Sequence, residues 1–376
     1  MSVAPSGPLF LGLDVGGTNI KAGCVGPAGE VLGRGAVPTG QADGCAIGLD
    51  RIEAAARAAL QDAGAELQDV AAVGLATPGP MDLKTGTLLC PSNLPGWRDW
   101  PVRDAVAGRF GKPTVLQNDA NAAAYGEYWS GAGRDADSLV LWTLGTGIGC
   151  GIILRDLVIE GEHSHGSECG HIIVDSSPDA RRHPGTGQRG TLEAYCGARG
   201  VIARTEEALN SGRPSSLQER VAAGAAVTPK LVCEAAAGGD ELATEILVDT
   251  ARWLGVGTVS VLHTIDPDAV LLAGAMTFGG PGTATGELFL ETLRAEVRDR
   301  AFPTVAEHLD VTFAKLGGDA GVVGAAGCAR RAFGGPGVNL EAAGEPGFAR
   351  GASAGYRHDA GPARPDPFPR LTDETD

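Results

Sequence analysis

The sequence predicts an α/β protein of two similar lobes that face each other across a cleft. The chain has 376 residues, a length that suits two domains of ordinary size better than one. A strand, a turn of Gly and Thr, and a returning strand occur twice with about the same layout. Apolar runs typical of buried strands also alternate with segments of helical spacing. Together these observations favour a duplicated architecture.

Hydrophobic periodicity predicts the elements of the first half. A hairpin comes first, with strands at 9–15 and 20–25 joined by the turn Gly16-Gly17-Thr18. A helix is expected over 45–63, where apolar side chains recur at helical spacing. Three more elements follow in order: a buried strand at 70–76, a short strand at 114–117 and an Ala-rich helix at 120–129.

The second half opens with a similar hairpin, whose strands at 138–144 and 150–154 flank the Gly-rich turn 145–149. A strand at 269–272 and a small-residue helix at 319–331 are expected further on. From residue 332 the chain is rich in Gly, Pro and charge without an apolar period, which is typical of a flexible tail. The predicted division is an N-terminal lobe of residues 1–118 completed by 312–331, a C-terminal lobe of 119–311, and a tail of 332–376.

Composition excludes several classes of protein. The formal net charge of −16, with no Lys/Arg cluster, argues against binding to nucleic acid. The eight Cys are scattered without C-x-x-C spacing, which is typical of a reduced, cytosolic chain. No secretory signal is evident, and no apolar run approaches the roughly 20 residues that span a bilayer. We therefore expect a cytoplasmic protein that binds neither nucleic acid nor membrane.

The first chemical motif is Asp14-Val-Gly-Gly-Thr-Asn19. Glycines allow successive backbone N–H groups to converge on phosphate oxygens, and Thr18 adds a hydroxyl donor. Asp14 lies where a carboxylate could hold the Mg²⁺ of MgATP. An ordinary hairpin turn is the competing interpretation, and for this motif alone it would be favoured.

The second turn, Gly145-Thr146-Gly147, has the same chemical character. Alone it is an equally weak indication of a phosphate site. Two such turns on separate hairpins are hard to explain as ordinary connections between strands. Neither turn opens a helix, so a dinucleotide-binding strand–turn–helix unit is excluded. The pair predicts a phosphate-binding site shared by two hairpins.

Asp119 follows a predicted strand and begins a predicted helix. A carboxylate at such a junction could accept the proton of a sugar hydroxyl that attacks a phosphate. Asn118 or Asp119 could equally serve as a helix N-cap, and the sequence does not decide between the two roles.

The densest polar cluster contains Glu168 and His171, with Glu193 further along the chain. Fixing one sugar epimer needs several hydrogen-bonding groups, and two carboxylates with a histidine supply them. A zinc site is the competing interpretation, but the His and Cys here lack a usual ligand spacing. A solvated loop accounts for His163 and His165.

Seven motifs of the chain resemble the ROK family in order and approximate spacing: LGLDVGGTNIKAG, GLATPGPMD, NLPGW, VLQNDANAAAYGE, GTGIGCGI, GSECGH and DAGVVGAA. The resemblance covers about residues 9–330. It implies the two-lobed actin-like, hexokinase-type ATPase fold, frequent homodimers, and ATP-dependent phosphorylation of hexoses at O6. The family also contains sugar-responsive repressors.

The resemblance assigns roles by position. Asp119 resembles the catalytic base and Asn118 its sugar-binding neighbour. Glu168, His171 and Glu193 resemble the residues that hold the sugar hydroxyls. The remaining positions resemble the nucleotide site: Asp14, Gly16, Gly17 and Thr18 in the first phosphate loop, Gly145, Thr146 and Gly147 in the second, and Gly274 at the adenosine, where the usual second glycine is Ala275.

One departure concerns zinc. Many ROK proteins carry three cysteines just before the second sugar-binding carboxylate, and these bind structural zinc together with a histidine. Here Pro184, Thr186 and Thr191 occupy those positions. We therefore predict no structural zinc, with His171 left to serve the sugar alone.

The expected activity is transfer of the γ-phosphate of ATP, with Mg²⁺, to O6 of glucose or a close relative. Kinases of N-acetylhexosamines, fructose or allose are the nearest alternatives, because one sequence does not show the shape of the pocket. A non-catalytic sugar sensor is less favoured, since both turns and Asp119 are present. A repressor is also disfavoured, because repressors of the family place a winged helix before the first phosphate loop.

Overall fold

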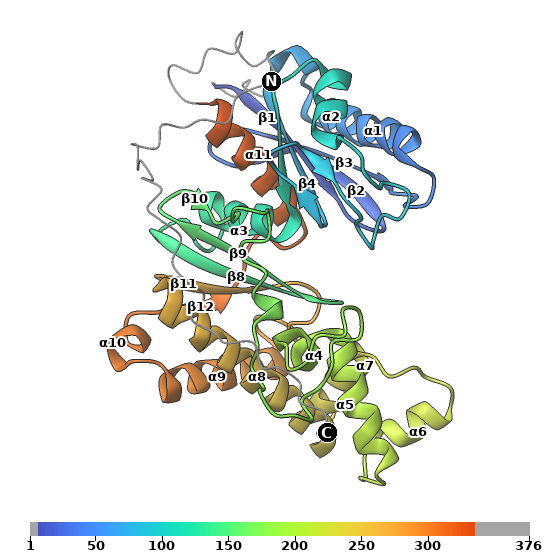
Figure 1. Ribbon diagram of the computed structural model, residues 1–376, viewed down its shortest axis with the longest axis vertical. Helices are drawn as coiled ribbons and strands as arrows, with labels where there is room; N and C mark the ends of the chain where they lie inside the picture. Colours follow the sequence, from blue (N-terminus) through green and yellow to red (C-terminus); the bar gives the residue numbers. More distant parts are fainter. Residues whose placement is uncertain (1–6, 335–376) are drawn as a thin grey trace, which may run out of the picture. The chain divides into compact units, whose positions relative to one another are not determined.

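The described part of the chain contains two five-stranded sheets, each with helices on both sides (Figure 1). The structure is a computed structural model, and it describes residues 7–334. The predicted tail lies almost entirely outside the described residues. Helix α11 (Ala320–Phe333) ends just before that boundary, two residues beyond the helix predicted at 319–331.

The first sheet has the strand order β3-β2-β1-β4-β7. Strand β1 is antiparallel to β2 and parallel to β4, which in turn is parallel to β7. The strands are β1 (Leu9–Val15), β2 (Asn19–Val25), β3 (Val31–Pro38), β4 (Val70–Thr77) and β7 (Thr114–Asn118).

The second sheet has the order β10-β9-β8-β11-β12. Strand β8 is antiparallel to β9 and parallel to β11, which is parallel to β12. The strands are β8 (Ser138–Leu144), β9 (Ile148–Leu154), β10 (Leu157–Val158), β11 (Ala269–Ala273) and β12 (Asp310–Phe313).

The two sheets therefore have the same order and the same strand directions, as the repeated hairpins predicted. In each sheet the central strand, β1 or β8, runs into a glycine turn and returns along the antiparallel neighbour. Strand β9 begins at Ile148, two residues before the predicted start, because Ile148 still pairs with Leu144. Each turn therefore lies at the carboxyl end of a central strand, the edge at which open α/β sheets usually bind ligands.

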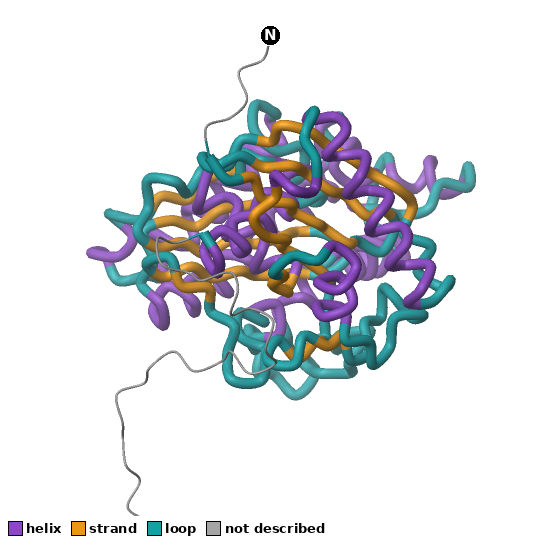
Figure 2. The backbone as a smooth tube through the Cα atoms, turned by 90° about the horizontal axis from the view of Figure 1, so that it is seen from above, coloured by secondary structure: helices purple, strands orange, loops and turns teal. Residues whose placement is uncertain are grey.

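Helices cover both faces of the first sheet. Helix α1 (Cys45–Ala63) lies against β2 and β3, and α2 (Val102–Phe110) lies against β7. On the other face α11 packs on β1 and β4. Helix α3 (Asp119–Ser130) packs against both α11 and the strands β8 and β9, so it joins the two sheets. Figure 2, seen from above, shows helices lying beside the strands.

The outer face of the second sheet carries a helical layer, which the sequence analysis did not predict. Its longest member, α8 (Glu241–Ile265), packs against the helices before and after it. The other helices are α4 (Leu192–Cys196), α5 (Ala198–Asn210), α6 (Leu217–Ala222), α7 (Pro229–Ala237), α9 (Ala284–Arg300) and α10 (Pro303–Ala306). The largest hydrophobic cluster lies between this layer and the sheet.

Small elements complete the described chain. A two-stranded ribbon pairs β5 (Met81–Asp82) with β6 (Thr87–Leu88). Three short 3₁₀ helices, which give tight turns, are η1 (Leu67–Asp69), η2 (Cys169–His171) and η3 (Gly317–Asp319).

Candidate functional site

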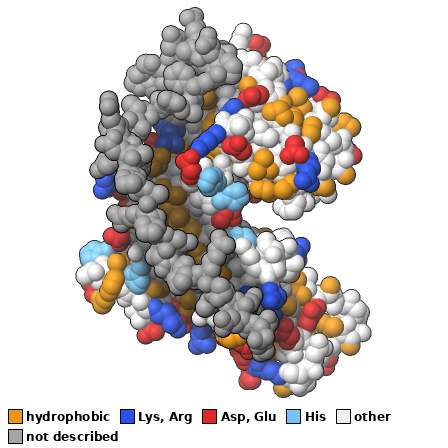
Figure 3. Space-filling view, in the orientation of Figure 1, with side chains coloured by type: hydrophobic (Ala, Val, Ile, Leu, Met, Phe, Trp, Pro, Cys, Tyr) orange, Lys and Arg blue, Asp and Glu red, His pale blue; other side chains and the backbone are white. Residues whose placement is uncertain are grey.

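A cavity of about 830 Å³ lies where loops from the two sheets meet. The face drawn in Figure 3 is hollowed there, with histidine side chains along the wall. The cavity is lined by the carboxyl ends of β7 and β8, by the residues after β11, and by the loops after β4 and before α4. Its lining residues are 79–80, 92–93, 118–120, 143–150, 165–166, 168, 171, 186, 188, 193 and 274–275. The candidate site therefore draws on both halves of the duplicated fold.

Asn118 and Asp119 lie at the junction of β7 and α3, at the wall of this cavity. Asn118 Oδ1 accepts hydrogen bonds from the N–H groups of Ala120 at 2.9 Å and Asn121 at 3.3 Å, so Asn118 is the N-cap of α3. Its amide nitrogen is not used in this cap. Asp119 is the first residue of the helix, and one carboxylate oxygen accepts the N–H of Ala120 at 2.9 Å. The cap role thus falls to Asn118 and leaves Asp119 facing the cavity.

The Asp119 carboxyl has an unusual electrostatic environment. Desolvation by the surrounding protein atoms raises its pKa to about 7, and the charges of Asp14 and Glu168 add to the increase. The side chain is nevertheless exposed, because it opens onto the water of the cavity. Burial among protein atoms and access to the open cavity therefore act on this pKa in opposite directions. A carboxyl that titrates near neutral pH suits a general base.

The first glycine turn is held by the main chain. The Gly16 N–H donates to the Asn19 carbonyl at 3.0 Å, and the Thr39 hydroxyl donates to the Gly16 carbonyl at 2.7 Å. Burial raises the pKa of the nearby Asp14, and the charge of Lys21 opposes that increase. Asp14 is close enough to Asp119 for the two charges to interact. The structure nevertheless leaves Asp14 and the predicted residues 16–18 outside the lining of the cavity.

The second glycine turn lines the cavity and is fixed to Glu193. The Ile148 N–H at the end of the turn donates to Glu193 Oε2 at 2.7 Å. A Cβ atom at Gly147 would lie 2.5 Å from the same oxygen, so only glycine permits this approach. Gly145 and Thr146 complete the turn, and all three predicted residues face the cavity. The turn and the predicted sugar-binding carboxylate therefore form one unit.

Gly274 lies against the strand that leads into this turn. Its φ of +99° is in the region that favours glycine, and a Cβ atom there would lie 2.2 Å from the Leu144 carbonyl oxygen. The Met276 N–H donates to that same carbonyl at 3.0 Å. Gly274 and Ala275 thereby border the cavity beside the second turn, and their role at a nucleotide remains a prediction.

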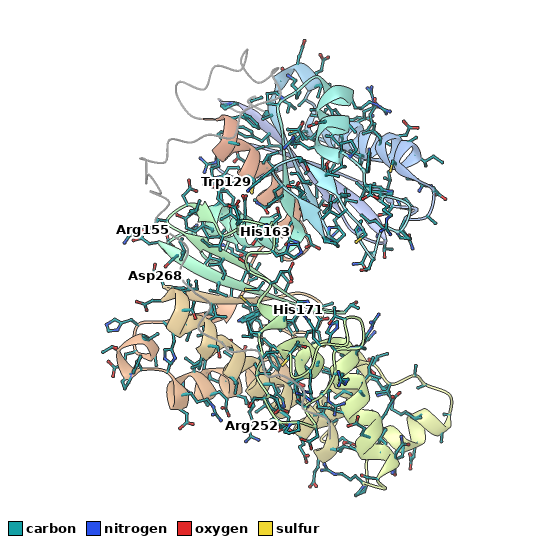
Figure 4. All side chains as sticks on the ribbon, viewed as in Figure 1. Trp129, Arg155, His163, His171, Arg252 and Asp268 are labelled. Atoms are coloured by element: carbon teal, nitrogen blue, oxygen red, sulfur yellow. The ribbon has the colours of Figure 1, made fainter. Side chains whose placement is uncertain are left out.

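Glu168 and His171 both line the cavity beside β9. Within residues 7–334 the Glu168 carboxylate has no hydrogen-bond partner, so it is open to a ligand. His171 is held in place, since its Nδ1 atom lies 2.9 Å from Gln188 Oε1. Figure 4 shows His171 close to α4 and the loop before it. One ring nitrogen is thus already used, and the expected role of His171 at a sugar remains a prediction.

His183 is a site residue that sequence reasoning missed. Its side chain is buried, and Nε2 forms a hydrogen bond with Glu193 Oε1. A small hairpin carries it: the His183 N–H donates to the Gln188 carbonyl at 2.7 Å, and the Gly187 N–H donates to the His183 carbonyl at 2.9 Å. The local sequence gave no periodic signal for this role. Its only clue was the pair of glycines, at 187 and 190, which both adopt positive φ.

The motifs GLATPGPMD and NLPGW also contribute residues to which the sequence analysis gave no role. Gly79 and Pro80 come from the first motif, and Asn93 comes from the second. His165, which was attributed to a solvated loop, lines the cavity as well. The family resemblance of these motifs was the available signal for the first three positions.

The residues at the expected zinc positions do not fit that metal. Pro184 has no side-chain donor atom, and hydroxyl groups are not ligands of structural zinc sites. Thr186 Oγ1 instead lies 3.0 Å from His183 Nδ1 and 3.0 Å from Gln188 Oε1, so hydrogen bonds shape the loop. Within the described residues no group of three or more His, Cys, Asp or Glu side chains could hold a metal ion. The absence of structural zinc remains a prediction.

The fold and the cavity define a class of protein before any sequence comparison. Two sheets with one strand order, each with a glycine turn after its central strand, form the actin-like ATPase fold of the hexokinase type. The chain belongs to the ROK family, whose sequence profile matches residues 10–332.

Individual relatives agree with this assignment. The chain is 31% identical to a glucokinase of Halalkalibacterium halodurans, over 84% of this chain and 93% of that protein. It resembles the crystal structure of a ROK hexokinase from Thermus thermophilus, with a TM-score of 0.71, 31% identity, and coverage of 86% of this chain and 98% of that one. A ROK glucokinase from Streptomyces griseus, solved with glucose and AMPPNP, has a TM-score of 0.68 and 34% identity, over 86% of this chain and 99% of that one. Relatives named as xylose repressors match as well, but this chain covers only about 60% of their length.

One further observation concerns membranes. Among the helices of residues 7–334, none is both long and apolar enough to cross a bilayer.

Proposed function

We propose that this protein is an ATP-dependent hexose kinase that transfers the γ-phosphate to O6 of glucose or a close relative. One observation carries the proposal. The Asp119 carboxyl, with a pKa raised to about 7, faces a cavity that also contains a glycine turn and an open Glu168 carboxylate. That combination provides a base, a phosphate-binding turn and a hydroxyl-binding acceptor in one place. The glucokinases among the relatives support the same chemistry.

The acceptor sugar would lie against Asn118, Glu168, His171 and Glu193. The Asn118 amide nitrogen can donate to a sugar oxygen, because only its Oδ1 is used in the cap of α3. Carboxylates accept hydrogen bonds from hydroxyl groups, so Glu168 and Glu193 suit a polyhydroxylated ligand. Several such groups acting together would discriminate between epimers.

Asp119 would accept the proton of O6 as that oxygen attacks the γ-phosphorus. The bond between O6 and phosphorus forms while the bond to the β-phosphate oxygen breaks, and ADP leaves with the electron pair. When the cavity closes and water leaves, desolvation strengthens the basicity of Asp119. The same step prevents transfer of phosphate to water.

The nucleotide would occupy the region between the second glycine turn and Gly274, with the first turn approaching its phosphates. Backbone N–H groups of both turns are suited to phosphate oxygens. The buried Asp14 carboxylate, whose side chain has no hydrogen-bond partner among residues 7–334, fits the oxygen ligands that Mg²⁺ prefers. When bound with ATP, Mg²⁺ supplies positive charge that offsets the charge of the phosphates.

The test is ADP release from MgATP by the purified protein across a panel of hexoses and N-acetylhexosamines. Strong turnover with glucose, and weaker turnover with its epimers, is the expected result. Mass and NMR analysis of the product would then place the phosphate at O6. Turnover only with an N-acetylhexosamine, fructose or allose would show that this sugar, and not glucose, is the acceptor. Sugar binding without ADP release would favour a sugar sensor.

Localisation and assembly belong to the same proposal. A kinase that consumes ATP and a free hexose fits the cytoplasm, which agrees with the scattered cysteines and the acidic charge. We further propose a homodimer that binds neither nucleic acid nor membrane. Light scattering coupled to size-exclusion chromatography measures the molar mass in solution and so tests the homodimer directly.

A further inference from the structure

Glu193 is the one predicted sugar-binding group that the protein holds at both carboxylate oxygens. Oε2 accepts the backbone N–H of Ile148 at 2.7 Å, and Oε1 forms a hydrogen bond with His183 Nε2. The Ile148 contact comes from the second glycine turn, and the His183 contact comes from the hairpin before α4. The position of this carboxylate therefore depends on two segments that lie on either side of it.

The hydrogen bonds at the other ring nitrogen fix the protonation of His183. Nδ1 accepts the backbone N–H groups of Gly185 at 3.1 Å and Thr186 at 2.8 Å. A backbone N–H can only donate, so Nδ1 must be the unprotonated nitrogen. In the neutral ring the proton then resides on Nε2, which donates to Glu193 Oε1.

From this arrangement we infer that His183 is a positioning residue, which aims the Glu193 carboxylate at the acceptor sugar. The inference rests on the proposed function, because it takes Glu193 as a sugar-binding group. His183 is buried and does not line the cavity, so it acts on the sugar only through Glu193. The donated hydrogen bond also leaves the remaining lone pairs of Glu193 for hydroxyl groups.

The same hairpin connects Glu193 to His171. Thr186 Oγ1 lies 3.0 Å from both His183 Nδ1 and Gln188 Oε1, and Gln188 Oε1 lies 2.9 Å from His171 Nδ1. The His171 and His183 rings are 5.3 Å apart between centroids. One hydrogen-bonded loop thus positions two predicted sugar contacts, His171 from η2 and Glu193 from α4. Its side chains hold one another by hydrogen bonds and do not need a metal ion.

Two substitutions of His183 distinguish its hydrogen bond to Glu193 from its hydrogen bonds to the backbone of its own loop. In His183→Gln the amide nitrogen can reach the place of Nε2 and still donate to Glu193. In His183→Asn the shorter side chain can accept the Gly185 and Thr186 N–H groups at the place of Nδ1, but it does not reach Glu193. The two variants differ by one methylene group. His183→Gln keeps the hydrogen bond to Glu193, and His183→Asn keeps those to the loop backbone.

Steady-state kinetics with the preferred sugar is the first measurement. His183→Asn is expected to raise the KM for sugar about tenfold, the effect of losing one hydrogen bond to a charged group. The KM for MgATP and kcat should each change by less than about threefold, because Asp119 and the nucleotide region keep their contacts. His183→Gln should restore the KM for sugar to within about threefold of the wild type.

A second measurement needs no substrate. Spectra of the protein labelled with ¹⁵N-histidine should show His183 as a neutral ring protonated on Nε2, identified by its loss in His183→Gln. Glu193→Gln should shift that Nε2 signal, since its partner changes from a carboxylate to an amide. This arm applies even if His183→Asn fails to fold.

The outcomes are separable. An unchanged KM for sugar in His183→Asn, or equal damage in both variants, would overturn the positioning role. A His183 ring protonated on Nδ1, or a signal insensitive to Glu193→Gln, would overturn the hydrogen-bond assignment. If the wild type phosphorylates no sugar, the proposed function fails, and the NMR arm still decides whether His183 holds Glu193.

Discussion

At the scale of single residues, the main electrostatic feature of the candidate site is the raised pKa of the Asp119 carboxyl, caused first by desolvation and then by the nearby carboxylates of Asp14 and Glu168. A surface aspartate ionises near pH 4 and is a weak base at neutral pH. The site therefore gives Asp119 a basicity suited to its proposed role. The same environment lowers the stability of the folded protein when Asp119 is ionised.

Asp119→Asn should reduce kcat by roughly 10²-fold or more while the KM for sugar changes little, because the amide keeps the shape of the side chain but accepts no proton. In the wild type, kcat/KM should rise with pH through about 7, the pKa of Asp119, because only the ionised form is a base. The residual activity of the variant should lack that rise. Turnover of the variant comparable to the wild type would remove Asp119 from the role of base.

The same pKa predicts a pH-dependent effect on stability. In the unfolded chain Asp119 loses its proton near pH 4, whereas in the folded protein it keeps the proton up to about pH 7. The folded state thus binds more protons in this window, so the free energy of unfolding falls as pH rises from 4 to 7. Asp119→Asn removes this loss, and its Tm should exceed that of the wild type by a few degrees at pH 8 but by little at pH 4.

Thermal unfolding of both proteins at several pH values measures this difference. Asp135→Asn is a matched control, because Asp135 is an exposed aspartate whose ion-pair partner is the adjacent Arg134. Its Tm difference from the wild type should not change with pH. A constant difference for Asp119→Asn as well would show that Asp119 does not titrate with a raised pKa.

The sequence predicted residues that line the cavity better than the residues that hold them in place. Asp119, Glu168 and the second glycine turn, which line the cavity, were singled out because their chemistry and their family motifs are visible in the sequence, and their roles remain predictions. His183 was not found, because its role depends on a hairpin that brings it to Glu193, ten positions away. Such a contact between two loop residues leaves no periodic pattern.

At the scale of elements, the close packing of α3 against α11 is the helix contact that bears most directly on Asp119. Gly126 on α3 and Gly324 on α11 lie at the crossing, and a Cβ atom on Gly324 would lie 1.5 Å from the Ala122 carbonyl oxygen. Helix α3 begins with Asp119 and also packs on β8 and β9. Because α11 packs on β1 and β4, the crossing sets the position of Asp119 relative to the first sheet.

Gly324→Ala should lower the free energy of unfolding by about 2 kcal/mol or more, because two backbones must separate to admit one methyl group. Gly108→Ala is the matched control, since Gly108 also lies within a helix, α2, and a Cβ atom there meets nothing within 4 Å. It should raise the free energy of unfolding by about 0.5–1 kcal/mol through helix propensity. Urea unfolding measures both, and equal effects of the two substitutions would contradict the close crossing.

Strands were predicted more completely than helices. The predicted strands at 9–15, 70–76 and 138–144 lie within one residue of β1, β4 and β8, because each is an apolar run bounded by turn residues. The helical layer between residues 198 and 300 was missed. Helix α8 is buried on several sides, so its apolar residues do not form the single stripe that marks a surface helix.

At the scale of the whole molecule, the duplication of the sheets explains why two glycine turns exist. Each turn follows the central strand of its own sheet, so the two turns belong to equivalent positions of a repeated design. The repeated hairpin was visible in the sequence, and this part of the architecture was predicted correctly. The complete lining of the cavity was not predictable, because it depends on how loops from distant parts of the chain meet.

The two turns differ in one respect that leads to the last prediction. The second turn and Gly274 line the cavity, whereas Gly16, Gly17 and Thr18 do not. In the proposed kinase both glycine turns contact the nucleotide phosphates. Binding of the two substrates should therefore bring the first turn to the nucleotide. Hydrogen exchange with glucose and AMPPNP tests this expectation: residues 145–149 should gain protection with nucleotide alone, and residues 14–19 only when sugar is also present. Asp119→Asn, which keeps both binding regions, should show the same pattern. Equal protection of both turns by nucleotide alone would mean that they are assembled before the sugar binds.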